Sequence, residues 1–217
     1  MLVSTIELFA RARRGDHLGI RGSEQLGLDW PAVISRKDKI VASWSESKNA
    51  TPAKLGVPVL RGHATFARPH EVTVDGRNYS AEKIVIATGS KPARPPIAGA
   101  ELGITSDELI HLKEQPRQLV VIGGGFIGLE FGFALARAGT KVTVLQSGPE
   151  IGPALDHDIR NILLECAGQA GMTIKTNMKV TRIRSDKRSK RKPTGARKIF
   201  PPIRCCLPPD VRPMSRR

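Results

Sequence analysis

The sequence of 217 residues predicts an α/β fold, and three observations between residues 119 and 145 carry this prediction. Residues 119–122 (LVVI) form a continuous apolar run, as in a strand buried on both faces of a parallel sheet. The glycine-rich turn GGGFIG at residues 123–128 follows at once and opens a helical pattern at residues 129–131. Residues 141–145 (KVTVL) then form a second strand, so the segment has the size and order of one βαβ unit.

The G-x-G-x-x-G turn, placed between a strand and a helix, is typical of a dinucleotide-binding site. Gly123 would permit the tight turn, Gly125 would let a pyrophosphate approach the backbone, and Gly128 would let the helix pack closely on its strand. The free N–H groups and the positive dipole at the start of the helix would hold the phosphates. The alternative is a glycine-rich turn that binds nothing, and the second strand makes it the less favoured interpretation.

Gln146 follows the second predicted strand, at the position that distinguishes NADH from NADPH. A carboxylate there would bind the ribose 2′-hydroxyl, whereas a nearby arginine would accept a 2′-phosphate. A glutamine side chain can hydrogen-bond to either group. The next residues are Ser147, Gly148, Pro149 and Glu150, none of them cationic, so the sequence favours NADH and leaves NADPH open.

The rest of the chain is predicted to alternate between helical and extended segments. Helices are expected at residues 1–15, from Trp30 to residue 49, and over residues 156–170, and Pro52 marks a break in the second of them. At the start of the third, an Asp beside His157 is expected to be the N-cap rather than a metal ligand. Strands are expected at residues 57–60, 62–66, 71–74 and 77–80, the last two joined by an Asp75-Gly76 turn. A buried strand is expected at residues 83–87, a third strand of the nucleotide unit begins at Thr173, and a strand-like piece covers residues 179–183.

The formal net charge of +15 is concentrated at one end of the chain. Residues 184–217 contain 12 Lys and Arg against 2 acidic residues, together with 6 of the 16 prolines. This composition predicts a disordered, basic, Pro-rich tail, interpreted as a non-native extension or shifted reading frame in preference to a nucleic-acid-binding arm. No apolar run is long enough to span a membrane, and three cysteines in no disulfide pattern favour a cytoplasmic location.

Two motifs in order give the chain a resemblance to a known family. The segment ATGS at residues 87–90, followed by Pro92, a linker and GGGFIGLE, resembles the pyridine nucleotide–disulfide oxidoreductases, which include dihydrolipoyl dehydrogenase, glutathione reductase and mercuric reductase. Residues 62–66 (GHATF) are similar as well. The resemblance implies two Rossmann-like dinucleotide-binding domains, both incomplete: a partial FAD-binding domain with a β-meander at 1–96 and an NAD(P)-binding domain at 97–183, with the tail at 184–217.

The resemblance also implies two cofactors, FAD and NAD(P)H, with hydride passing from the nicotinamide to the flavin. Phe126 would be an aromatic gate over the flavin, and Ile127 and Glu130 would flank the nicotinamide, although Glu130 could equally be a first-turn acid that complements the helix dipole. The residues expected near FAD are His63, Ala64, Ala87, Thr88, Gly89 and Ser90. Those expected near NAD(P) are Gly123, Gly124, Gly125, Phe126, Ile127, Gly128, Leu129, Glu130 and Gln146.

Several family features are absent from the sequence. The N-terminal βαβ unit for FAD, the C-x-x-x-x-C redox pair, the last strands of the NAD(P) domain and the dimerisation domain with its His-Glu pair have no counterpart. The expectation is therefore a fragment of an FAD-dependent oxidoreductase, without catalytic or metal-binding residues and inactive alone. The alternative is a non-catalytic NAD(H)-binding remnant or an interaction module with a nucleic-acid-binding tail. Cys205-Cys206 resembles the C-terminal pair of mercuric reductases, and Cys166 is expected to be a core or boundary thiol.

Overall fold

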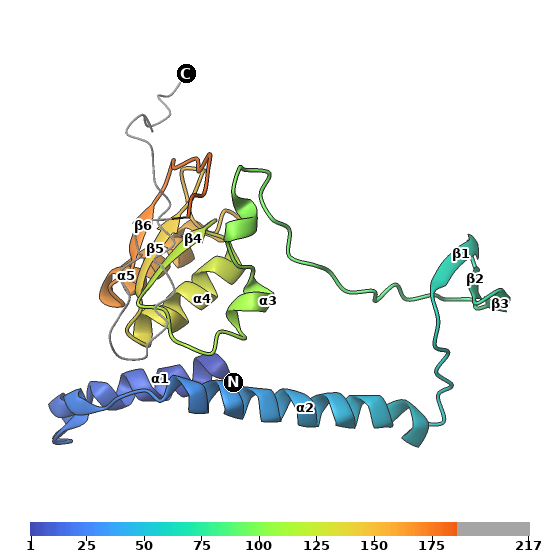
Figure 1. Cartoon of the computed structure of the whole chain (residues 1–217), viewed down its shortest axis with the longest axis horizontal. Coiled ribbons are helices and arrows are strands. Elements are labelled where there is room, and N and C mark those ends of the chain that lie inside the picture. The colour runs from blue at the N-terminus through green and yellow to red at the C-terminus, as the bar shows by residue number, and fades with distance from the viewer. Residues whose placement is uncertain (186–217) are drawn as a thin grey trace. The chain divides into compact units, whose positions relative to one another are not determined.

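A computed structural model describes residues 1–185, and the chain divides into two units (Figure 1). The first unit contains Met1–Lys37 and the chain from Pro92 onward, and the second contains Asp38–Lys91. The tail predicted to be disordered lies, apart from its first two residues, outside the described residues.

A three-stranded parallel sheet organises the first unit. Its strands are β4 (Gln118–Ile122), β5 (Lys141–Leu145) and β6 (Thr173–Lys175), in the order β4-β5-β6. Helix α4 (Phe126–Arg137) connects β4 to β5, and α5 (His157–Gln169) connects β5 to β6 (Figure 1). The predicted βαβ unit and the third strand are confirmed, and the predicted α/β class with them.

The core of this unit lies between β5 and α4. Val142 and Val144 have no exposed surface, and Leu135 of α4 is 2% exposed. The alternation of valines along β5 turns both toward the helix, because side chains two residues apart share one face of a strand. Gly132 of α4 would place a Cβ only 2.8 Å from the Cε of Met172, so the helix approaches closely at this point.

Two further helices contribute to the first unit. Helix α1 (Leu2–Arg13) packs against α4 and buries Ile6. Helix α2 (Trp30–Lys54) begins where the Asp29 carboxylate accepts a hydrogen bond from the Ala32 N–H at 3.0 Å, a side-chain N-cap. The indole N–H of Trp30 donates to the Leu112 carbonyl at 2.8 Å and ties this helix to the segment before β4.

The break predicted at Pro52 is wrong, because α2 continues through it to Lys54. A proline lacks its own N–H but leaves the neighbouring hydrogen bonds possible. The Thr51 hydroxyl donates to the Ser47 carbonyl at 2.8 Å, and the Leu55 N–H donates to the Thr51 carbonyl at 3.1 Å. These bonds hold the last turn together around the missing donor.

The second unit contains an antiparallel meander of β1 (Ala64–Arg68), β2 (Glu71–Val74) and β3 (Arg77–Ser80). The predicted hairpin turn is confirmed: Asp75 and Gly76 have φ angles of 48° and 79°, and Val74 pairs with Arg77. Two positive φ angles in succession match the right-handed twist of the flanking strands.

Three predicted strands are wrong. Residues 57–60 and 83–87 lie outside any helix or strand, and Val85 and Ile86 are 87% and 70% exposed. An apolar run becomes a strand only beside another strand, and none in residues 1–185 pairs with either segment. The piece at 179–183 forms a single bridge, between Ala98 and Arg182.

The predicted helix at 156–170 is confirmed as α5, with Asp156 at the N-cap position but without a side-chain capping bond. Over residues 1–185 no helix combines the length and hydropathy needed to cross a membrane.

Truncation of Leu135 tests the location of the core. We expect Leu135→Ala to lower the free energy of unfolding by about 2–5 kcal/mol, because it leaves a cavity between α4 and β5. The matched control is Leu164→Ala in α5, where the side chain is 42% exposed and the loss should stay below about 1 kcal/mol. Urea unfolding followed by circular dichroism compares them, and equal losses would contradict the assignment.

Candidate functional site

The glycine turn lies where β4 ends and α4 begins. Gly123 has a φ of +107°, and its N–H donates to the Leu145 carbonyl at 2.8 Å, so the turn is attached to the end of β5. A Cβ at Gly128 would stand 2.5 Å from the Gly123 carbonyl oxygen and 2.9 Å from Cγ1 of Val121. Both glycines therefore meet a backbone requirement that a larger residue could not meet without strain or movement.

Gly125 differs from these two because nothing lies within 4 Å of the position of a Cβ. It is the N-cap residue of α4, with φ −80° and ψ 178°, and its carbonyl accepts the first helical bond, from the Leu129 N–H at 3.0 Å. The N–H groups of the first turn have no intrahelical acceptor, and this turn contains no acidic side chain. The space above Gly125 thus faces backbone donors and the positive end of a helix dipole.

The other predicted residues on α4 lie on different faces. Phe126 and Ile127 are 56% and 60% exposed, whereas Leu129 is buried in the core and could reach a ligand only through its backbone. Glu130 is exposed but lies beyond the first turn, because α4 begins at Phe126 and not at residue 129. The interpretation of Glu130 as a first-turn acid is therefore wrong.

Gly124 is held on both sides. Its N–H donates to Oε1 of Gln146 at 2.9 Å, and its carbonyl accepts from the Gly152 N–H at 2.7 Å. Ile151, 1% exposed, lies so close that a Cβ at Gly124 would be 2.9 Å from its Cγ2. The loop after β5 therefore fixes the glycine turn. The sequence analysis did not predict this arrangement, and the third consecutive glycine is the only local feature that indicates it.

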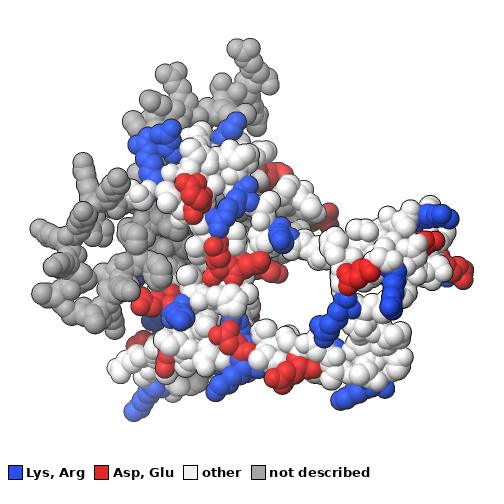
Figure 2. Space-filling model, turned by 45° about the vertical axis from the view of Figure 1, so that its right-hand side comes forward, with Lys and Arg blue, Asp and Glu red and all other residues white. Residues whose placement is uncertain are grey.

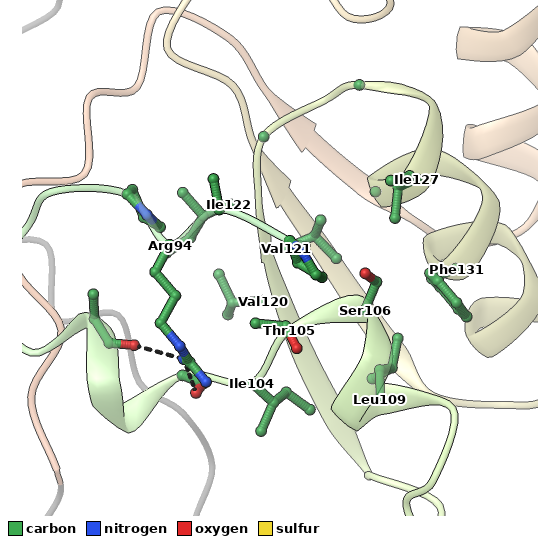
Figure 3. A pocket seen from close by; sticks show the side chains of 18 of the residues that line it. Arg94, Ile104, Thr105, Ser106, Leu109, Val120, Val121, Ile122, Ile127 and Phe131 are labelled. Atoms are coloured by element: carbon green, nitrogen blue, oxygen red, sulfur yellow. Dashed lines mark hydrogen bonds between the residues drawn. The ribbon is translucent and has the colours of Figure 1, made fainter. Parts of the chain in front are cut away.

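An apolar cavity of about 550 Å³ lies beside β4 (Figure 3). Val121 of β4 lines it together with Ile127 and Phe131 of α4, while Thr105 and Leu109 come from the segment that precedes the strand. Gly123, Gly125 and Gly128 also line it, so the glycine turn borders the cavity. The cavity offers apolar surface next to the backbone donors of α4, the combination that small-molecule sites use.

Arg94 fixes the segment opposite α4. Its guanidinium donates to the carbonyls of Ala100 and Gly103, at 3.0 and 2.6 Å, and to Oε2 of Glu108, at 2.8 Å (Figure 3). Glu108 also accepts from the Thr105 N–H at 2.6 Å, and Thr105 Oγ1 accepts from the Glu108 N–H at 3.4 Å, a capping box at the start of α3 (Ser106–Leu109). The hydrogen bonds from the Thr105 backbone and side chain, followed by the charge of Arg94, lower the pKa of Glu108 below its ordinary value of 4.5. The T-x-x-E pattern at 105–108 was the signal for this feature.

The residues expected near FAD all belong to the Asp38–Lys91 unit. Ala64 begins β1, while His63 precedes it and residues 87–90 lie outside any strand. All six are exposed. Their contact with a flavin stays a prediction, as does the contact of residues 123–130 and 146 with NAD(P). Among the described residues there is no group of three His, Cys, Asp or Glu side chains that could hold a metal ion.

Comparison with known proteins finds consistent similarity to one family. Residues 22–200 match the family described as pyridine nucleotide-disulphide oxidoreductase. A dihydrolipoyl dehydrogenase of Acholeplasma laidlawii is 30% identical over 187 residues, which cover 83% of this chain and 56% of the relative. A glutathione reductase of Nostoc sp. is 38% identical over 156 residues, covering 72% and 34%.

Solved structures agree with the sequence relatives. The HOCl-induced flavoprotein disulfide reductase RclA from Escherichia coli superposes with a TM-score of 0.62 at 30% identity, covering 81% of this chain and 40% of that one. LpdA from Mycobacterium tuberculosis gives a TM-score of 0.67 at 25% identity, covering 84% and 41%. The chain spans between about a third and just over half of the length of these proteins.

The lowered pKa of Glu108 predicts a pH-dependent contribution to stability. A carboxylate whose pKa is depressed by folding stabilises the native state above its unfolded pKa, and this contribution disappears as the pH falls through the folded value. Glu108→Gln keeps the capping geometry without the charge. We expect the wild type to be more stable than Glu108→Gln at pH 7 and the difference to shrink below pH 4.5. Thermal unfolding of both proteins between pH 3 and 7 measures this difference, and one that does not change with pH would contradict the assignment.

Proposed function

Since the chain belongs to the pyridine nucleotide-disulphide oxidoreductase family, we propose that residues 97–183 bind NAD(P)H as one domain of an FAD-dependent oxidoreductase. Members of this family use FAD and NAD(P)H. The observation that carries the proposal is the open space above Gly125, where a Cβ would meet nothing and where first-turn N–H groups of α4 have no intrahelical acceptor. A pyrophosphate needs such a place, because its oxygens accept hydrogen bonds and its negative charge favours a helix N-terminus.

The residues around this space have distinct proposed roles. The N–H groups of Phe126 and Ile127 would donate to the phosphates, and their exposed side chains would contact the nicotinamide end near the apolar cavity. Glu130, exposed one turn further along α4, would accept from the carboxamide. The bound cofactors supply the hydride chemistry, and this chain supplies binding and orientation.

We assign residues 1–96 to the FAD-binding domain on the family resemblance, although Met1–Lys37 belongs to the first unit, with the parallel sheet. Backbone groups of His63 and Ala64 would contact the adenine, and residues 87–90 would lie against the flavin nucleotide. A cytoplasmic location is part of the same proposal, whereas homodimers are a property of the family's members. The alternative, nucleic-acid binding by the basic tail, falls on residues of which 186–217 lie outside the described range. On the face in Figure 2, Lys and Arg are interspersed with Asp and Glu over the described part of the chain, so this face offers no separate basic surface.

Replacement of Gly125 tests the pyrophosphate contact. Gly125→Ala adds a methyl group in open space at an ordinary φ of −80°, so we expect the fold to be retained and the affinity for NADH to fall about tenfold or more. Gly168→Ala in α5 is the matched control, because its Cβ also meets nothing within 4 Å. Calorimetric titration with NADH should separate the two variants, and unchanged affinity of Gly125→Ala would contradict the pyrophosphate site.

We also propose that this chain alone transfers no electrons to a disulfide. Disulfide exchange by an enzyme of this family uses a C-x-x-x-x-C pair, which this sequence lacks, and Cys166 is the one cysteine among residues 1–185. Cys205 and Cys206 lie outside the described residues. Purified protein supplied with FAD and NADH should not reduce oxidised glutathione or lipoamide. The absorbance of NADH monitors the reaction. Turnover above that of free FAD would contradict this proposal, and loss of that turnover in Cys205→Ser would assign it to the vicinal pair.

A further inference from the structure

We propose that the free edge of β4 binds the same edge of a second copy of this chain, so that the two parallel sheets join through an antiparallel pair of β4 strands. The contact uses the sheet edge of the first unit and not the dimerisation domain of the family, which has no counterpart in the sequence. It would form whether or not the glycine turn holds a dinucleotide.

The backbone groups of β4 form two sets, of which one faces β5. The Gly123 N–H donates to the Leu145 carbonyl at 2.8 Å, and the Arg117 carbonyl accepts from the Lys141 N–H at 3.0 Å. Because successive residues of a strand face opposite sides, the odd-numbered residues of β4 also face β5. The residues whose N–H and C=O groups face away are Gln118, Val120 and Ile122. Among residues 1–185 no strand pairs with them, since the sheet order is β4-β5-β6.

The side chains of β4 distinguish it from the other edge strands. Charged residues and prolines on an edge strand discourage pairing with another chain. Arg68 lies in β1, Arg77 in β3 and Lys175 in β6. In contrast, β4 contains neither a charged residue nor a proline. In the part of the chain that the structure describes, β4 is therefore the edge strand without this protection.

The surface around β4 is apolar and exposed. The cavity beside the strand is lined by Ile122, by Ile104 of the segment before β4 and by Ile127 of α4 (Figure 3). These side chains are 38%, 40% and 60% exposed. An exposed apolar patch next to an unpaired strand is typical of a surface that binds another chain. A second strand would cover the patch and supply hydrogen-bond partners to the outward backbone groups of β4.

A second copy fits this edge because β4 can pair with itself. In an antiparallel pair, opposite residues whose backbone groups face each other exchange both of their hydrogen bonds. A two-fold axis at Val120 places it opposite Val120 of the partner subunit, and Gln118 opposite the partner's Ile122. All the outward groups of both strands are then paired. Arg117, which precedes the strand, would lie opposite the partner's Gly123, so no like charges meet along the strands despite the net charge of +15.

Charges at Val120 test both the pairing and its register. Sedimentation velocity of the full chain over a dilution series should show an equilibrium between monomer and dimer. Val120→Lys and Val120→Glu each place two like charges opposite one another at the axis, so each variant should dimerise at least about tenfold more weakly. An equimolar mixture of the two variants should regain the dimer, because opposite charges then meet.

Val120→Pro removes a donor from the free edge alone. The Val120 N–H faces away from β5, so the bonds between β4 and β5 remain and the dimer should weaken at least about tenfold. The matched control is Ile174→Pro in β6. The Lys175 carbonyl accepts from the Gln146 N–H, so the neighbouring Ile174 faces the opposite free edge of the sheet. This control should dimerise as the wild type does.

Hydrogen exchange measured by NMR gives a second readout on the unmodified chain. The amides of Val120 and Ile122 should exchange slowly at high protein concentration and faster on dilution, because only the dimer supplies their acceptors. The amide of Val121, which faces β5, should exchange slowly at every concentration.

The other possible states of this edge give different results. A monomer in which Val120 and Ile122 exchange slowly at every concentration means that another segment of the same chain covers the edge. A monomer in which they exchange rapidly means that the edge stays open. Either result overturns the proposal, and so does a dimer that persists unchanged in all three Val120 variants, because it uses another surface. If the Lys and Glu variants remain monomeric when mixed, the pairing at Val120 is overturned.

Discussion

The close approach of α4 to the end of β4 is the constraint on which the rest of the first unit depends. The missing side chain of Gly128 lets the helix lie against the Gly123 carbonyl and Val121, and Gly132, one turn later, lets it lie against Met172. With the helix at this distance, its apolar face covers Val142 and Val144. The N–H groups of its first turn lie beyond the carboxyl end of β4. A larger residue at Gly128 would meet the Gly123 carbonyl oxygen and displace the start of the helix, whereas at Gly132 it would meet the flexible end of the Met172 side chain. The contact between α4 and the end of β4 therefore decides both how the core packs and where the N–H donors of the candidate site lie.

The two ends of the candidate site differ in character, and the difference suits a dinucleotide. At the end of β5, hydrogen bonds from Gly124 and the chain after β6 fix Gln146. On the other side of the turn, Ile127 and Phe131 border an apolar cavity. Between them lies the start of α4, where a charged linker group would be held. A ligand with a polar sugar end, an anionic centre and a flat ring at the other end matches this order.

The parts of the fold that were predictable from the sequence are those with local causes. The βαβ unit follows from one apolar run, one glycine turn and one alternating strand, and the hairpin at Asp75-Gly76 follows from the φ angles those residues tolerate. Residues 83–87 were predicted as a strand because they are apolar, but pairing depends on a neighbour that the segment itself does not specify. The contact between Gln146 and Gly124 was unpredictable for a similar reason, since the register of β5 against the turn decides which donor the amide meets. Pro52 shows the opposite error, in which a strong local signal is overruled by the hydrogen bonds of Thr51.

The Asp38–Lys91 unit buries no apolar side chain, whereas the first unit buries Val142, Val144 and Leu145 of β5. A three-stranded meander without a covered face gains little from the hydrophobic effect, and its ladder of backbone bonds competes directly with water. Opening of such a ladder requires a free energy close to zero, whereas opening of β5 requires that of the whole core. The polypeptide thus joins a region that opens locally to one that opens only when its core unfolds. A protease would cleave the first region under conditions in which spectroscopic probes of global unfolding still report a folded protein.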